Sequence, residues 1–87
     1  MPSLKQVELG EAFLRQKGFR ICRVRHHGNV ARIEVPVGDL PRLVSEPMRG
    51  EVAAALKSYG YTYVSVDLAG FRSGSGNEVL KTTYAKV

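Results

Sequence analysis

Residues 22–34, CRVRHHGNVARIE, place two adjacent histidines and three arginines around a single glycine. Imidazole side chains are common metal ligands and general bases, whereas the planar guanidinium group of arginine binds phosphate and carboxylate groups. The stretch therefore raises three kinds of chemistry: a metal centre, a catalytic base and an anion-binding site. Which of them is feasible depends on the element that carries these side chains.

The stretch has the pattern of a β-hairpin. Residues 19–26 and 30–36 are rich in Ile, Val and Phe with rough alternation, which predicts two strands. Gly28-Asn29 between them suits a two-residue turn of type II′, with glycine first. The resulting register places three pairs opposite each other: His27 with Val30, Arg25 with Arg32, and Arg23 with Glu34. The last of these predicts a cross-strand ion pair.

The two histidines are adjacent in a strand, so they should point to opposite faces of the sheet. Two ligands on opposite faces do not readily hold one metal ion. His27 could act as a base, but no nucleophile partnered with it is visible. We therefore expect His26 and His27 to be structural or solvated residues.

Arg25 opposite Arg32 is unfavourable, because like charges directly across a ladder repel each other. Two kinds of group could offset this repulsion: a carboxylate of the chain, from Asp67 or Glu11, or a bound phosphate or carboxylate. The alternation places Arg23 on the same face. We therefore predict an anion-binding set of Arg23, Arg25 and Arg32.

The surrounding elements follow from periodicity and from capping residues. A helix is predicted at about 4–17, with Ser3 and Gln6 as a capping box. Leu9, Ala12, Phe13 and Gln16 share one face of this helix, and the apolar part of that stripe is predicted to face the core.

The second half of the chain predicts a short helix near 40–45 capped by Asp39, a helix at 48–60 and a strand at 61–68. The inward face of the longer helix is predicted to be Met48, Val52, Ala55, Leu56 and Tyr59. The inward residues of the strands are predicted to be Cys22, Val24, Ala31, Ile33, Val35, Val64, Val66 and Leu68.

The order α-β-β-α-α-β predicts an α+β fold, a small two-layer α/β sandwich. A three-stranded sheet carries its helices on one face, which leaves the other face open. We expect a single domain over 1–87, with its core at about 4–68 and a C-terminal loop and tail at 69–87. The strand order does not follow from the sequence.

Composition narrows the class of protein further. A hydrophobic content of 44% indicates a folded domain, and a formal net charge of +5 favours anionic ligands. A single cysteine, Cys22, excludes an intramolecular disulfide and favours a reducing, cytoplasmic setting. The strand pattern makes it a buried thiol rather than a nucleophile. No long apolar run is present, so we expect no membrane span.

The element order also matches the type II KH arrangement, a small RNA-binding module. That module has a G-x-x-G loop between its paired helices, whereas the corresponding stretch here, EPMRG, has one glycine. RNA binding is therefore the alternative function.

Residues 11–34 and 60–78 resemble the C-terminal part of the LarE-type proteins, most specifically in VRHHGNVARIEVP and DLAGFRSGSGNE. These are ATP-dependent sacrificial sulfur transferases of the PP-loop ATP pyrophosphatase superfamily. The family's nucleotide-binding S-G-G-x-D-S loop is absent from the 87 residues, as is the P-C-L-x-S-R-type stretch that carries the sacrificial cysteine. The resemblance therefore implies an accessory domain that is not a complete enzyme.

In that family, arginines and carboxylates of this domain bind substrate phosphate and sometimes metal. The matching residues are Arg23, Arg25, Glu34 and Glu11, so the resemblance implies a divalent metal at Glu11 and Glu34. Phosphate or a nucleotide is the expected ligand. The expected partners are a separate PP-loop domain protein or a second copy of the chain. RSGSGN at 72–77 could wrap an anion, but we expect a flexible loop.

Overall fold

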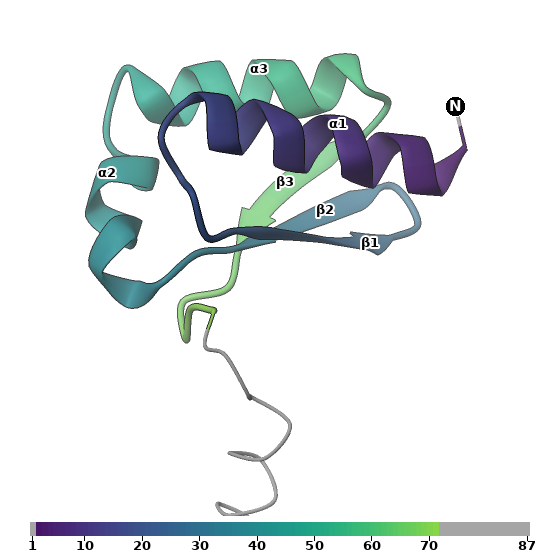
Figure 1. The fold of residues 1–87 in the computed structure, drawn as a ribbon. Coiled ribbons are helices and arrows are strands. Elements are labelled where there is room, and N and C mark those ends of the chain that lie inside the picture. Colours follow the sequence, from purple (N-terminus) through teal and green to yellow (C-terminus); the bar gives the residue numbers. More distant parts are fainter. Residues whose placement is uncertain (1, 72–87) are drawn as a thin grey trace, which may run out of the picture.

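The computed structural model describes residues 2–71 and shows the predicted α-β-β-α-α-β order, with one additional 3-10 turn. Figure 1 shows the elements, which are α1 (Ser3–Gln16), β1 (Arg23–His27), β2 (Val30–Glu34), η1 (Val37–Asp39), α2 (Leu40–Val44), α3 (Met48–Ser58) and β3 (Tyr63–Val66). The predicted α+β class is confirmed.

The strand order, which the sequence left open, is β1-β2-β3. β1 pairs with β2 in antiparallel orientation, and β3 runs parallel to β2 on its other side. The helices cover one face of this sheet, so the molecule has two layers (Figure 1). Within residues 2–71, no helix lies over the opposite face.

The hairpin register is the predicted one, with Arg25 opposite Arg32 and Arg23 opposite Glu34. Gly28 has a φ of +59°, in the region that favours glycine, whereas Asn29 has no positive φ. A type II′ turn requires this combination. The turn therefore sets which side chains share a face.

The core lies between the sheet and the helices. All five inward residues predicted for the first two strands are buried. Val64 and Val66 are partly buried and pack against this core. Leu68, also predicted to point inward, is 81% exposed. That prediction is wrong because β3 ends at Val66 and the chain then turns.

This turn is formed around Asp67. The Asp67 carboxylate accepts the N–H of Ala69 at 2.9 Å, and its carbonyl accepts the N–H of Gly70 at 3.0 Å. An aspartate that bonds the backbone two residues later is typical of an Asx turn. Strand alternation therefore does not extend to Leu68.

The buried stripe of α1 differs from the predicted one. Gln6, Gly10 and Leu14 are the buried residues of α1, whereas Ala12 is exposed and Phe13 is partly buried against the core. The prediction is confirmed for Phe13 and wrong for Ala12, because Gly10 is a contact position and not only a weak helix former. A Cβ atom at Gly10 would lie 3.3 Å from Cγ2 of Val24, so the missing side chain lets α1 approach β1 closely.

Both predicted side-chain caps are absent. Pro2, not Ser3, is the N-cap of α1, and neither Pro2 nor Asp39, the N-cap of α2, makes a side-chain cap hydrogen bond. The Asp39 carboxylate instead lies 3.9 Å from the guanidinium group of Arg42. Asp39 has helical backbone angles, whereas a capping residue is typically extended, so its carboxylate is not placed to cap the helix.

β1 begins at Arg23, later than the predicted start at residue 19. Gly18 has a φ of +102°, and the N–H of Phe19 donates to the carbonyl oxygen of Leu14 at 2.9 Å. This is the pattern of a Schellman-type helix end. It turns Phe19 into the core, where the side chain is fully buried.

Among residues 2–71, no helix is long and apolar enough to cross a membrane. The predicted loop at 72–77 lies outside the described residues.

Candidate anion-binding face

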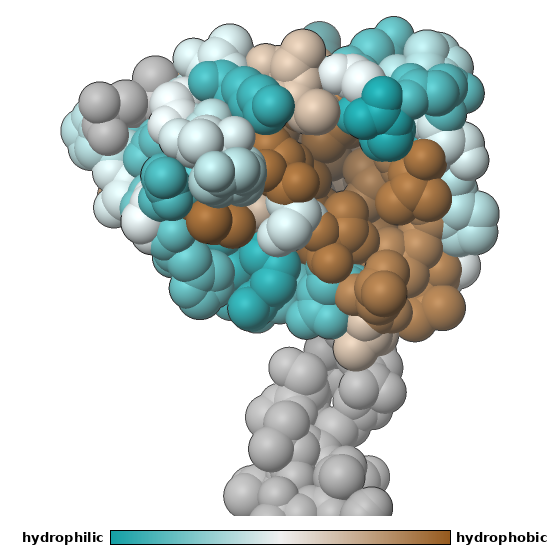
Figure 2. All heavy atoms as spheres, turned by 180° about the vertical axis from the view of Figure 1, so that it is seen from behind, coloured by the Kyte–Doolittle hydropathy of each residue, from teal (hydrophilic) through white to brown (hydrophobic). Residues whose placement is uncertain are grey.

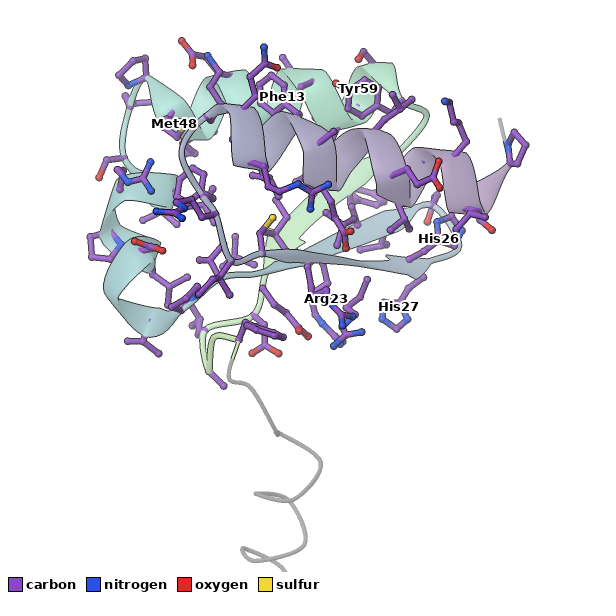
Figure 3. The ribbon with its side chains drawn as sticks, viewed as in Figure 1. Phe13, Arg23, His26, His27, Met48 and Tyr59 are labelled. Atoms are coloured by element: carbon purple, nitrogen blue, oxygen red, sulfur yellow. The ribbon has the colours of Figure 1, made fainter. Side chains whose placement is uncertain are left out.

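The open face of the sheet carries the predicted anion-binding residues. Arg23 and Arg25 come from β1 and Arg32 from β2, joined by Glu34 of β2 and by Asp67 just after β3. We call these five residues the arginine face. Figure 3 shows Arg23 and His27 pointing away from the helical layer. The structure thus brings the three predicted arginines onto one surface.

Glu34 is the centre of this arginine face. Its Oε1 accepts a hydrogen bond from Nε of Arg25 at 3.2 Å, and its Oε2 accepts one from Nη2 of Arg32 at 3.3 Å. The Glu34 side chain is only 10% exposed, whereas the arginines are 38% and 40% exposed. One carboxylate therefore separates the two like charges that the register places opposite each other.

Arg23 does not form the predicted ion pair with Glu34. The carboxylate turns toward Arg25 and Arg32, because these two charges repel each other and a carboxylate between them stabilises both. Within residues 2–71, Arg23 has no acidic partner, and its guanidinium carbon lies 5.8 Å from the ring centre of Phe71. Arg23 is therefore the arginine of this face that is most available to a ligand.

Asp67 contributes a weaker interaction. Its Oδ2 lies 3.9 Å from Nε of Arg32, too far for a hydrogen bond, and this buried Nε has no hydrogen-bond partner among the described residues. The three guanidinium groups face two carboxylates, which leaves one positive charge on the arginine face. The two carboxylates neutralise most of the positive charge of this face, and the remaining charge attracts anions.

Glu11 makes a contact with the backbone of β1. It lies on α1, in the helical layer, and its Oε2 accepts the backbone N–H of Val24 at 3.0 Å. The structure does not bring Glu11 to Glu34, which contacts arginines on the other face. No group of three or more metal-ligating side chains occurs within the described residues. The metal site at Glu11 and Glu34 stays a prediction from the resemblance.

The two histidines point to opposite sides of the sheet, as predicted (Figure 3). His26 faces the helical layer, where its Nδ1 lies 2.9 Å from the hydroxyl oxygen of Tyr61, and His27 is exposed. They do not share a metal site.

Cys22 is buried, with its Sγ 3.8 Å from the carbonyl oxygen of Glu11. Burial raises the pKa of the Cys22 thiol, which outweighs the lowering effect of nearby Arg15. A thiol with a raised pKa is a poor nucleophile near neutral pH. The geometry agrees with a structural cysteine.

Sequence reasoning missed two contacts of this region. The bridging role of Glu34 had a usable signal, because Glu34 lies two residues from Arg32 on one strand and diagonal to Arg25 on the next. The bond from Val24 to Glu11 had no local signal, because it joins elements whose packing the sequence does not specify.

Two curated proteins resemble this chain over nearly all of its length. The chain is 43% identical over 81 residues to the pyridinium-3,5-bisthiocarboxylic acid mononucleotide synthase of Lactiplantibacillus plantarum. The matched region covers 90% of the chain and 28% of the synthase. It is 38% identical over 77 residues to the uncharacterised protein slr1717 of Synechocystis sp., with 88% of the chain and 29% of that protein covered. No protein-family model matches the chain.

These similarities confirm the resemblance to the LarE-type sulfur transferases. The chain spans less than a third of the length of these relatives, and the PP-loop motif is not in its sequence. The similarity therefore covers one domain-sized part of a longer protein.

Proposed function

We propose that this chain is an accessory domain related to the LarE-type proteins and is not catalytic by itself. Its arginine face binds the phosphate group of a phosphate-bearing ligand. The observation that carries this proposal is the position of Arg23, an exposed arginine without an acidic partner among residues 2–71, beside two arginines held by Glu34.

The geometry explains how three arginines could bind one anion. Glu34 engages Nε of Arg25 and one terminal nitrogen of Arg32, which leaves further N–H donors of both guanidinium groups unused within the described residues. Because Glu34 holds these groups, less conformational freedom is lost when an anion binds. In this proposal Glu34 is a positioning residue and not a metal ligand.

The test compares phosphate with chloride at equal ionic strength. Phosphate or a mononucleotide should raise the melting temperature of the wild type more than chloride does, since a ligand of the folded state stabilises it. Arg23→Gln should remove this excess. Lys57→Gln, which deletes one charge from the exposed side of α3, is the matched control and should keep it. An equal effect of phosphate and chloride on the wild type would overturn the proposal.

A separate PP-loop domain is the second candidate partner, because the chain corresponds to only 28% of the synthase. A purified PP-loop protein that lacks this domain should then form a complex with the chain, measured by sedimentation. The absence of a complex at high micromolar concentration would contradict it. The element order is the observation that favours the RNA-binding alternative, whereas the connection between α2 and α3, residues 45–47, carries no G-x-x-G loop.

A further inference from the structure

The two outer edges of the sheet differ. At β1, Glu11 of α1 accepts the N–H of Val24 and so protects that strand. At β3, no further strand lies beyond the edge within residues 2–71. Exposed edges offer unpaired N–H and C=O groups to another strand, and proteins usually cover or charge them. β3 is therefore the edge that can accept a partner.

The outward groups of β3 can be assigned from the ladder. The N–H groups of Tyr63 and Asp67 donate to the carbonyl oxygens of Asn29 and Ile33, in and beside β2. Successive residues of a strand direct their N–H and C=O groups to alternate sides. Val64 and Val66 therefore direct theirs away from β2, toward the open edge.

An apolar hollow lies beside the same edge. Its volume is about 190 Å³, and Val64 and Val66 of β3 line it together with Arg49 and apolar side chains of β2, α2 and α3. Figure 2, a view from behind, shows apolar surface gathered on this side of the molecule. Arg49, the one charged lining residue, pairs with Glu46, so the hollow carries no unpaired charge that would repel an identical chain.

We propose that a second copy of this chain pairs with β3 in antiparallel orientation, with Ser65 on the two-fold axis. In this register Val64 lies opposite Val66 of the other copy, and each pair exchanges backbone hydrogen bonds. The two three-stranded sheets become one sheet of six strands, and the two hollows meet beneath the new pairs.

The chemistry of β3 matches this self-pairing. With Ser65 opposite Ser65 of the second copy, apolar Val64 and Val66 share the core face. Tyr63 then lies opposite Asp67 of the other copy, the residue that follows β3 and whose Oδ1 already accepts the N–H of Ala69. A tyrosine hydroxyl can donate to a carboxylate, and no like charges lie directly across the axis. A strand that is complementary to itself under a two-fold rotation favours a second copy over an unrelated partner.

The test is the mass of the protein in solution and its response to charge at position 65. The wild type should approach twice the 9.6 kDa chain mass as its concentration rises. Ser65→Lys and Ser65→Glu should each weaken association about two- to fivefold, because each places like charges across the axis. Ser58→Lys, at an exposed position on α3, is the matched control and should leave the dimer intact.

Mixing the two charged variants makes the test specific for this register. Ser65→Lys and Ser65→Glu should together restore a dimer, since residue 65 then faces an opposite charge only if it lies on the axis. Circular dichroism verifies that each variant is folded. The proposal is overturned by a wild type that stays monomeric at several hundred micromolar, which would indicate that another segment or partner covers β3. It is equally overturned by variants that stay dimeric or by a mixture that stays monomeric. This test does not depend on phosphate binding.

Discussion

The buried carboxylate of Glu34 reduces the electrostatic repulsion between two arginines of the hairpin. The register places Arg25 directly opposite Arg32, which taken alone is a repulsive pair. The Glu34 carboxylate bonds to both guanidinium groups, so the folded state carries little of that repulsion. The arginines are thus part of the scaffold as well as candidates for binding.

Glu34→Gln should lower the free energy of unfolding by about 1–2 kcal/mol, because it removes the charge between two arginines that are partly exposed. The same variant should gain more stability from phosphate than the wild type does, since a bound anion would replace the lost carboxylate. Urea unfolding with and without phosphate, at equal ionic strength, measures both effects.

Glu51→Gln is the matched control for this variant. Glu51 forms an exposed ion pair with Lys17 at 3.0 Å, and exposed pairs contribute less than about 1 kcal/mol. If Glu34→Gln behaved like this control in both stability and phosphate response, Glu34 would not hold the two arginines apart.

At the scale of the elements, α1 and α3 are joined by a buried side chain. Gln6 on α1 is 8% exposed, and its Nε2 donates a hydrogen bond to the carbonyl oxygen of Tyr59 at 3.0 Å. Tyr59 ends α3, where the last carbonyl groups lack partners within the helix. Gln6 therefore fixes one helix against the end of another, which explains a polar residue inside the buried stripe.

Gly60→Ala should destabilise the fold through this joint. Gly60 has a φ of +111°, and a Cβ atom there would lie 2.8 Å from Nε2 of Gln6. Backbone strain together with displacement of Gln6 should cost about 1–3 kcal/mol. Thermal or urea unfolding gives the value.

Gly38→Ala provides the comparison, because a Cβ atom at Gly38 meets no atom within 4 Å and no positive φ is present. This variant should change stability by less than about 1 kcal/mol. Equal losses for the two variants would refute the proposed joint between α1 and α3.

At the scale of the whole molecule, helices cover one face of the sheet and the other face carries the arginines (Figure 1). The synthase of L. plantarum is more than three times as long as the region that matches. Within residues 2–71, the arginine face and the β3 edge are the two sides of the sheet on which our proposals rest.

The isolated chain should release no pyrophosphate from ATP above a blank reaction. Its 87 residues lack the S-G-G-x-D-S loop of the PP-loop superfamily, so no such loop is present to hold the nucleotide phosphates. A coupled pyrophosphate assay with ATP and a nicotinate-type substrate measures this. Turnover that follows the purified chain through successive columns would contradict the prediction.

The sequence by itself determined the order of the elements, the hairpin register and the inward residues of β1 and β2. These follow from local rules, namely the two-residue turn at Gly28-Asn29 and the period of two along a strand. The resemblance to LarE-type proteins was also readable, because it depends on short contiguous stretches such as VRHHGNVARIEVP.

Only the tertiary structure decided which face of α1 is buried, which arginines Glu34 binds and where β3 lies in the sheet. Gly10 lies in the contact because Val24 of β1 packs there, and the helical pattern alone does not contain that contact. The Glu34 carboxylate bonds to Arg25 and Arg32 and not to Arg23, which lies directly opposite it, because between Arg25 and Arg32 it reduces their mutual repulsion. The contact at Gly10 and the place of β3 depend on residues far apart in the chain, and the Glu34 contacts depend on the paired hairpin, so these energies act only after the elements have packed.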